Sequence, residues 1–209
     1  MNIKLTAKNQ IKIENADDIY GVMQRILLRE QKTDRGREHF WTISLDNAHK
    51  ILNIELVSMG SFRATIVEPM EVFSIPLQKR AVKLVLVHNH PSGRLTPSTA
   101  DKDITDHMIQ VGRIMNVPVL DHLIITENSY YSFVNTGLLE ELEKSLKYVP
   151  AFEIKRRYEK AAQEKGEQVG ENKKAKEIAR EMKKKGVPVE MIIEYTGLTK
   201  TVINRLKVE

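Results

Sequence analysis

The sequence predicts an α+β fold, a mixed β-sheet flanked by helices and followed by a small all-helical module. Three observations support this class. Strand-like runs alternate with helical periodicities up to about residue 137, the run "LVLV" at 84–87 is typical of a buried strand, and charged, helix-forming sequence begins at Leu138. These changes divide the chain into an N-terminal helical segment (1–34), a mixed domain (35–137), a charged helical linker (138–170) and a terminal helical module (171–209).

The first predicted elements are a helix and a hairpin. Apolar residues recur at helical spacing after Asn15 and Asp17, either of which can serve as the N-cap, and they predict a helix from about 16 to 30. Two β-rich runs, 38–45 and 50–59, flank the sequence "DNAHK" and predict a β-hairpin.

Strands and helices alternate through the middle of the chain. Pro69 suits the first turn of a helix over 70–80, which Pro76 keeps short or kinked. The pattern then predicts a buried strand at 81–87, a helix over 97–116, a strand at 117–126 and a last strand within 129–137. The residues expected to face inward from the helix over 97–116 are Ile104, Met108, Val111 and Met115.

The C-terminal sequence predicts a connector and a small helical bundle. Pro150 interrupts the charged linker, and Gly166 and Gly170 weaken its helical character. An apolar stripe closed by Gly186 predicts one helix, and two shorter helices flank the turn at 196–199. The stripe consists of Ala175, Ile178, Ala179 and Met182.

Composition narrows the class of protein. The 209 residues contain no Cys, so only His and carboxylates can hold a metal ion. No apolar run approaches the roughly 18 residues of a membrane span, and the N-terminus lacks the apolar core of a signal peptide, so we expect a cytoplasmic protein with no membrane partner. The net charge of +5 comes from residues 150–209, which hold 15 Lys/Arg and 10 Asp/Glu. Such an excess is typical of a solvated helical face and also suits a nucleic-acid or acidic partner.

Two histidines and a carboxylate lie where the strand at 81–87 leads into the next helix. Residues two apart on a strand face the same side, so His88 and His90 should point together and Asn89 away from them. Asp101, near the start of the helix, can reach back toward the strand end. Two His and one carboxylate leave one coordination position open, as in a catalytic zinc centre that activates water, and this indicates hydrolysis.

Each of these features also has a simpler interpretation. Ser98 and Asp101, three residues apart, form an ordinary capping box, and a single His-x-His after a strand is more often a hydrogen-bonded turn. Their combination at one strand-to-helix junction favours a metal site.

The string His88-Asn-His90-Pro91, followed by Ser98 and Asp101, resembles the His-x-His-x7-Ser-x2-Asp signature of the JAMM (MPN+, JAB) metalloprotease superfamily. The longer text "HNHPSG…TPSTAD…LDHLIIT" resembles the RadC branch of that superfamily, over roughly residues 35–137. The resemblance implies an MPN/JAB-type fold and a zinc-dependent peptidase or isopeptidase. His88, His90 and Asp101 would bind Zn²⁺, and Ser98 would hydrogen-bond the attacking water or the oxyanion.

The superfamily also uses an upstream Glu as general base, and Glu38 in "GREHFW" matches that position. A Glu at the start of a strand is by default a surface charge. Glu71 is the second choice because it lies in "EPMEVF", which resembles another RadC motif, although there it suits the start of a helix. Glu55 and Glu68 are further competitors.

Asp121 and His122 in "LDHLIIT" also match the RadC pattern. Adjacent residues on a strand face opposite sides, so at most one of them can look into the site, either to orient a metal-bound His or as a structural His. We expect Asn89 and the turn residues Ser92 and Gly93 to shape the approach to the metal.

Two features depart from the RadC pattern. RadC-type proteins usually carry a helix-hairpin-helix DNA-binding region before the metal domain, whereas only about 35 residues precede it here, which weakens the expected association with DNA repair. The usual turn "SGDPTPS" is "SGRLTPS" here, so Arg94 adds a positive charge near the metal cleft. This change should alter substrate preference rather than metal ligation.

The tail resembles the short helical motif, with "TGLT" between helices, that follows transposase-derived nuclease-like domains in bacteria. Its basic balance suits DNA contact through 171–209, with 199–207 as recognition helix, while a protein-interaction or capping role is the alternative. Three functions therefore stay open: a zinc peptidase, a DNA-associated protein such as a metal-dependent nuclease, and a non-catalytic scaffold. Two His and a carboxylate also describe an iron triad, but the Ser and the spacing favour zinc.

Overall fold

The computed structural model describes residues 11–60 and 67–206, and these ranges form two compact units. The first unit is Met1–Val149 and the second is Pro150–Glu209. The first unit contains a mixed sheet with helices packed against it, which confirms the predicted α+β class. The predicted division at residues 34, 137 and 170 remains a prediction.

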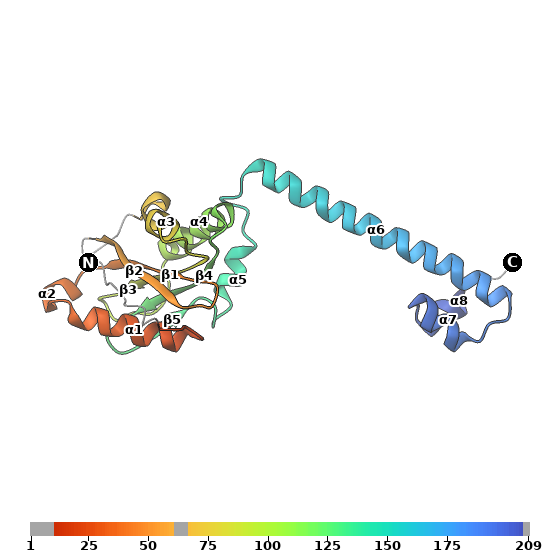
Figure 1. Cartoon of the computed structure of the whole chain (residues 1–209), viewed down its shortest axis with the longest axis horizontal. Coiled ribbons are helices and arrows are strands. Elements are labelled where there is room, and N and C mark those ends of the chain that lie inside the picture. The colour runs from red at the N-terminus through yellow and green to blue at the C-terminus, as the bar shows by residue number, and fades with distance from the viewer. Residues whose placement is uncertain (1–10, 61–66, 207–209) are drawn as a thin grey trace. The chain divides into compact units, whose positions relative to one another are not determined.

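A five-stranded sheet forms the centre of the first unit (Figure 1). Its strands are ordered β2 (Ile51–Met59), β1 (His39–Leu45), β3 (Lys83–Asn89), β4 (Val119–Ile125) and β5 (Tyr130–Ser132). The strand β1 pairs antiparallel with both β2 and β3, which confirms the predicted hairpin. β3 and β4 are parallel, and β5 closes the edge antiparallel to β4.

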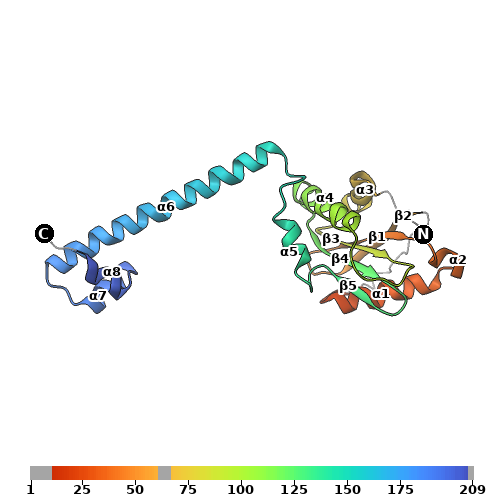
Figure 2. The same ribbon diagram turned by 180° about the vertical axis from the view of Figure 1, so that it is seen from behind.

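Helices cover both faces of this sheet (Figures 1 and 2). The helix α1 (Ala16–Arg29) lies on one face, and α3 (Pro69–Gln78) and α4 (Thr99–Met115) lie on the other. Because successive strand residues alternate between faces, two hydrophobic cores form. In β3, Val85 and Val87 enter the core under α1, whereas Leu84 and Leu86 enter the core under α3 and α4.

The helix α4 matches its predicted extent closely but differs from it in one inward residue. Met108 is fully buried and Ile104 and Val111 are half-buried, as predicted, whereas Met115 is 45% exposed. The prediction for Met115 was wrong because the helix ends at Asn116 in a left-handed conformation, and Val117 and Val119, which follow it, fill the core instead.

Two short helices flank the strands of the sheet in the sequence. A short α2 (Lys32–Arg35) precedes the sheet, and α5 (Leu138–Glu143) follows it. Leu138 and Leu139 of α5 are buried in the core under α4, so the packed part of the first unit extends past residue 137.

The second unit contains α6 (Ala151–Lys184), α7 (Val189–Thr196) and α8 (Lys200–Arg205). Gly166 and Gly170 do not interrupt α6, which begins directly after Pro150. A small core joins the end of α6 to the two short helices and consists of Ala179, Ile192, Leu198, Ile203 and Leu206. Ile178 was predicted to join it but is 50% exposed.

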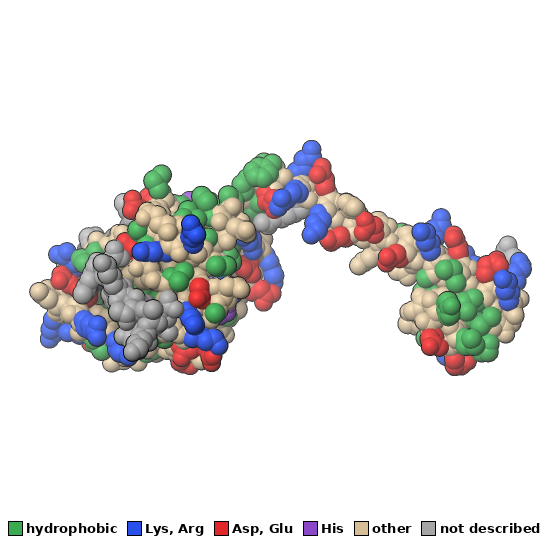
Figure 3. Space-filling view, viewed as in Figure 1, with side chains coloured by type: hydrophobic (Ala, Val, Ile, Leu, Met, Phe, Trp, Pro, Cys, Tyr) green, Lys and Arg blue, Asp and Glu red, His purple; other side chains and the backbone are tan. Residues whose placement is uncertain are grey.

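Part of this second unit carries an exposed apolar surface (Figure 3). Met191 and Tyr195, one turn apart on α7, are 52% and 80% exposed. The described ranges contain no helix with both the length and the apolar character needed to cross a membrane.

Candidate metal centre

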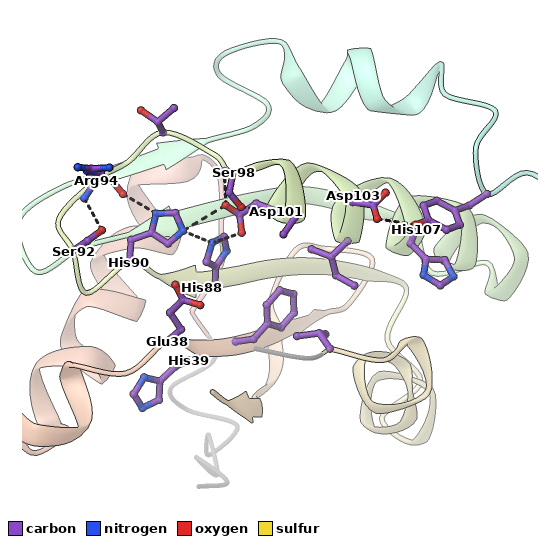
Figure 4. Close-up of a pocket in the computed structure, with 16 residues that line it drawn as sticks. Glu38, His39, His88, His90, Ser92, Arg94, Ser98, Asp101, Asp103 and His107 are labelled. Atoms are coloured by element: carbon purple, nitrogen blue, oxygen red, sulfur yellow. Dashed lines mark hydrogen bonds and ion pairs between the residues drawn. The ribbon is translucent and has the colours of Figure 1, made fainter. Parts of the chain in front are cut away.

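Three elements of the first unit meet at the candidate site. β3 supplies His88 and leads directly into His90, while the start of α4 supplies Ser98 and Asp101. The antiparallel register places Phe40 opposite His88, so Glu38, two residues before Phe40, lies next to the histidine pair. Figure 4 shows the Glu38 carboxylate directed toward His88 and His90.

The ligand atoms of His88, His90 and Asp101 all lie within 4.8 Å of one another (Figure 4). The two Nε2 atoms are 2.9 Å apart. Asp101 Oδ1 lies 3.2 Å from His88 Nε2, and Asp101 Oδ2 lies 3.5 Å from His90 Nε2. The predicted grouping of two imidazoles and one carboxylate is therefore present, whereas their role as ligands remains a prediction.

The partner of His90 determines which of its ring nitrogens carries the proton. His90 Nδ1 lies 2.7 Å from the backbone carbonyl oxygen of Arg94. A carbonyl only accepts hydrogen bonds, so Nδ1 is the donor and Nε2 presents its lone pair to the cluster.

The proton on His88 follows from a longer chain of hydrogen bonds. Thr105 Oγ1 donates to the Asp101 carbonyl at 2.5 Å, so at 2.6 Å from His122 Nδ1 it accepts. His122 Nε2 is then an acceptor for His88 Nδ1, 2.7 Å away. The chain leaves His88 Nε2 unprotonated and facing His90 Nε2.

This arrangement suits a bound cation. Two nitrogen lone pairs 2.9 Å apart, with a carboxylate beside them, repel one another unless a positive charge lies among them. His, His and carboxylate are also a donor set that divalent zinc accepts. The side chains present therefore fit the metal that the family resemblance implies.

Electrostatics of the cluster favour an ionised carboxylate. Burial alone would raise the pKa of the Asp101 carboxyl, but its contacts with His88 and His90 and its hydrogen bond with Ser98 hold that pKa well below its usual range. Burial lowers the pKa of His90, but Asp101, the Arg94 carbonyl and the charge of Glu38 outweigh it and raise this pKa overall. Burial and the nearby His88 charge lower the pKa of His122 well below its ordinary value.

Ser98 and Asp101 also form the capping box that the simpler interpretation predicts. Asp101 N donates to Ser98 Oγ at 3.1 Å, and Ser98 N donates to Asp101 Oδ2 at 2.6 Å. The capping box orients the carboxylate toward the histidines, so the cap and the cluster use the same two residues.

The other candidate acids lie elsewhere in the described part of the chain. Glu38 lines the groove at the cluster, whereas Glu55, Glu68 and Glu71 do not. Glu71 is exposed in the first turn of α3, where the sequence also placed it.

Asp121 and His122 face opposite sides of β4, as neighbours on a strand must. His122 contacts His88, whereas Asp121 accepts hydrogen bonds from Ser132 Oγ at 2.6 Å and Val134 N at 3.0 Å. Burial raises the pKa of the Asp121 carboxyl despite these bonds.

The cluster lies at one end of a groove of about 560 Å³. Arg94 and Ser92 line it near His90, and Ile104 and His107 of α4 continue it away from the cluster. His107 stacks on Tyr148 with ring centroids 4.3 Å apart. Tyr148 Oη donates to Asp103 at 2.9 Å, and Lys147 forms an ion pair with the same carboxylate.

Two residues contribute to the site in ways that the sequence did not predict. Thr105 lies one helical turn after Asp101, and this spacing could have indicated that it faces the same side of α4. Asn89 was expected to shape the approach to the metal, but its side chain contacts the strand that carries Glu38 on the far side of the sheet.

Comparison with known proteins is consistent with this geometry. The model of the RadC-like JAB domain family matches residues 13–138, more than half of the chain. A UPF0758 protein of Flavobacterium johnsoniae is 42% identical over 127 residues, which are 61% of this chain and 53% of that protein. UPF0758 proteins of Chlorobium chlorochromatii and Methanosarcina barkeri are 34% and 39% identical, over 64% and 61% of this chain and 58% and 54% of their own lengths.

The chain thus spans a little more than half the length of these curated relatives. The matched region contains the whole sheet, the histidine pair, Ser98, Asp101 and Glu38. The predicted resemblance is confirmed: the chain belongs to the RadC-like JAB domain family.

Proposed function

We propose that the protein is a zinc-dependent hydrolase of the JAMM type that cleaves peptide or isopeptide bonds. The observation that carries the proposal is the convergence of two unprotonated Nε2 atoms and the Asp101 carboxylate, with Glu38 and Ser98 in the same groove. Zinc held by His88, His90 and Asp101 would act as a Lewis acid and lower the pKa of a coordinated water.

The side chains around the metal would supply the proton transfers. Glu38 would take a proton from the attacking water and deliver it to the leaving nitrogen, the work of a carboxylate general base within hydrogen-bond reach. Ser98 Oγ accepts from the Asp101 amide, and its hydroxyl proton can point into the groove. A donor in that place would stabilise the negative charge that develops on the carbonyl oxygen.

The charges along the groove favour a peptide over a nucleic acid. Apart from the histidines, the charged side chains that line it in the described ranges are three carboxylates, Glu38, Asp101 and Asp103, and one cation, Arg94. With the two positive charges that a bound Zn²⁺ would add, the groove would carry no net charge, so it would not attract a phosphate backbone and would suit an uncharged peptide backbone. Ile104 and Phe40 add an apolar wall that suits a side chain of a peptide.

Metal content tests the proposal most directly. We expect stoichiometric zinc in the wild-type protein and none in His88→Ala. The control is His49→Ala, which should keep full zinc; His49 lies in the turn between β1 and β2 and contacts Lys83 of β3. Elemental analysis of the three proteins, purified side by side, measures this. Iron in place of zinc after anaerobic purification would contradict the choice of metal.

The rate of cleavage distinguishes the proposed general base from the metal ligands. Glu38→Gln should keep the metal and lose cleavage of peptide or isopeptide substrates by about 10²- to 10⁴-fold, because the amide cannot accept the proton. Loss of zinc from Glu38→Gln would instead make Glu38 a ligand and overturn its role. An unchanged rate in Glu38→Gln would mean that another group is the base.

A second proposal concerns DNA contact through residues 171–209. Described residues 171–206 hold nine Lys/Arg and five Asp/Glu, and α7 and α8 are joined at Gly197, which has a positive φ of 67°. Within the expected recognition helix the structure describes residues 199–206, of which α8 spans Lys200–Arg205; Lys207 lies outside the described residues. Lys183 of α6 donates to the carbonyls of Ile203, Asn204 and Leu206. The cations of α8 itself are Lys200 and Arg205; both are exposed, and Lys200 forms an ion pair with Glu190.

A further inference from the structure

Asn89 lies between the two histidines in sequence, but its side chain serves the opposite face of the sheet. His88 and His90 point toward α4, whereas Asn89 is 1% exposed and points toward the first residue of β1, His39. There its side-chain amide forms two hydrogen bonds. His39 N donates to Asn89 Oδ1 at 2.7 Å, and Asn89 Nδ2 donates to the Arg37 carbonyl at 2.9 Å.

These two bonds bracket Glu38. Backbone pairing of β1 with β3 ends at Phe40 and His88, so the Asn89 side chain provides the next contacts between these two strands. On the other side of β1, Gly60 N donates to the Glu38 carbonyl at 2.8 Å. The backbone of Glu38 is therefore fixed on both flanks and at its own carbonyl.

The contacts couple two groups that must act together. The histidines on either side of Asn89 face the candidate metal position, and the Glu38 carboxylate is directed toward the same position (Figure 4). A short buried amide between them keeps the distance from Glu38 to the histidine pair independent of the loop that precedes β1. General-base catalysis requires such placement, because a misplacement of about 1 Å can lower a rate on the order of 100-fold.

We propose that Asn89 is a positioning residue that holds the general base Glu38 against the metal-ligating histidines. This inference rests on the proposed function of Glu38. It assigns to the residue between the two histidines a role that differs from ligation and from substrate contact. Asn89 acts through the backbone of residues 37–39, so its removal should move Glu38 and leave His88, His90 and Asp101 in place.

The first experiment measures, without any substrate, how firmly the segment around Glu38 is held. Asn89→Ala removes both hydrogen bonds, and Asn89→Val removes them while filling the space with a β-branched side chain suited to a strand. Asn53→Ala is the matched control, since Asn53 is a buried amide on β2 whose side chain bonds Glu55. Amide hydrogen exchange is recorded for the zinc-loaded full chains, together with zinc stoichiometry.

We expect the amides of His39 and Gly60 to exchange at least about tenfold faster in both Asn89 variants than in the wild-type protein. In Asn53→Ala both amides should exchange at the wild-type rate. The His90 amide, which donates to Ile125, should keep its wild-type rate, and zinc stoichiometry should not change. Unchanged exchange at His39 would overturn the inference. Equal acceleration at His90, or loss of zinc, would make Asn89 a general stabiliser of the site and would also overturn it.

The second experiment is a double-mutant cycle with Glu38→Gln on peptide or isopeptide cleavage. If Asn89 acts through Glu38, Asn89→Ala should lower kcat about 10- to 100-fold with KM nearly unchanged, and should cause no further loss in the Glu38→Gln background. Additive losses would overturn the inference. A protein that cleaves no such bond contradicts the proposed function, while the exchange result still decides whether Asn89 holds the Glu38 segment.

Discussion

Thr105 ends the chain of hydrogen bonds that determines how His88 presents its Nε2 atom. Its hydroxyl proton goes to the Asp101 carbonyl, so its oxygen can only accept from His122. Without the Thr105 oxygen as acceptor, the proton of His122 can move from Nδ1 to Nε2, and His122 would then donate to His88 Nδ1. The proton of His88 would in turn lie on Nε2, the nitrogen that faces the metal position.

We therefore expect Thr105→Val, which keeps the shape of the side chain and removes the hydroxyl, to weaken zinc binding by about 10- to 100-fold. Thr105→Ser keeps the hydroxyl and should bind zinc with nearly wild-type affinity. Competition with a chromophoric zinc chelator measures both dissociation constants. Equal affinities in the two variants would mean that the hydroxyl does not set the tautomer of His88.

The metal cluster was predictable from the sequence because local geometry determines it. His88 and His90 share a side through the two-residue period of a strand, and Asp101 reaches back because it occupies the third position of a capped helix. The hydrogen bond between His88 and His122 could not be predicted from the sequence, because it depends on the parallel register that places Leu86 beside His122. Pairing between strands separated by a helix leaves no local signal.

At the scale of elements, α4 is fixed against the sheet by the close approach at Gly112. A Cβ atom on this residue would lie 2.6 Å from the carbonyl oxygen of Val117, which belongs to the backbone and has little room to move. The same approach lies where the chain turns from α4 into β4.

Substitution of two helical glycines by alanine should therefore have opposite effects. Gly112→Ala should lower the free energy of unfolding by about 1–3 kcal/mol, because the strain of overpacking exceeds the gain in helix propensity. Gly21→Ala, in α1 with no atom near its Cβ position, should raise it by about 0.5–1 kcal/mol. Urea denaturation measures both, and a stabilised Gly112→Ala would show that the turn after α4 adapts freely.

Helix interruptions were the least predictable property of the elements. Gly166 and Gly170 were expected to weaken the helical character of this segment, yet α6 runs through both, since an isolated glycine costs a helix only about 1 kcal/mol. Charged pairs one turn apart, such as Lys155 with Glu159 and Lys160 with Glu164, offset part of that cost. Proline is the stronger signal, and α6 does begin directly after Pro150.

At the scale of the whole molecule, each unit has hydrophobic cores of its own. The sheet and its helices enclose two cores within residues 13–139, and the third core consists of residues from the end of α6, α7 and α8. The long, polar first part of α6 separates these cores in sequence. The candidate metal residues, the proposed general base Glu38 and their supporting hydrogen bonds all belong to the first unit.

We therefore expect a fragment of residues 1–149 to fold alone, with a urea midpoint equal to that of the same unit in the full chain and one zinc site of unchanged affinity. Circular dichroism and zinc competition measure these two properties. If residues 171–209 contact DNA, the full chain should bind a DNA duplex with an affinity that falls steeply with salt, and the fragment should show no such binding. A fragment that unfolds or loses zinc would mean that the second unit is required for the site, whereas equal DNA binding by both proteins would place nucleic-acid contact in the first unit and contradict the role of the tail.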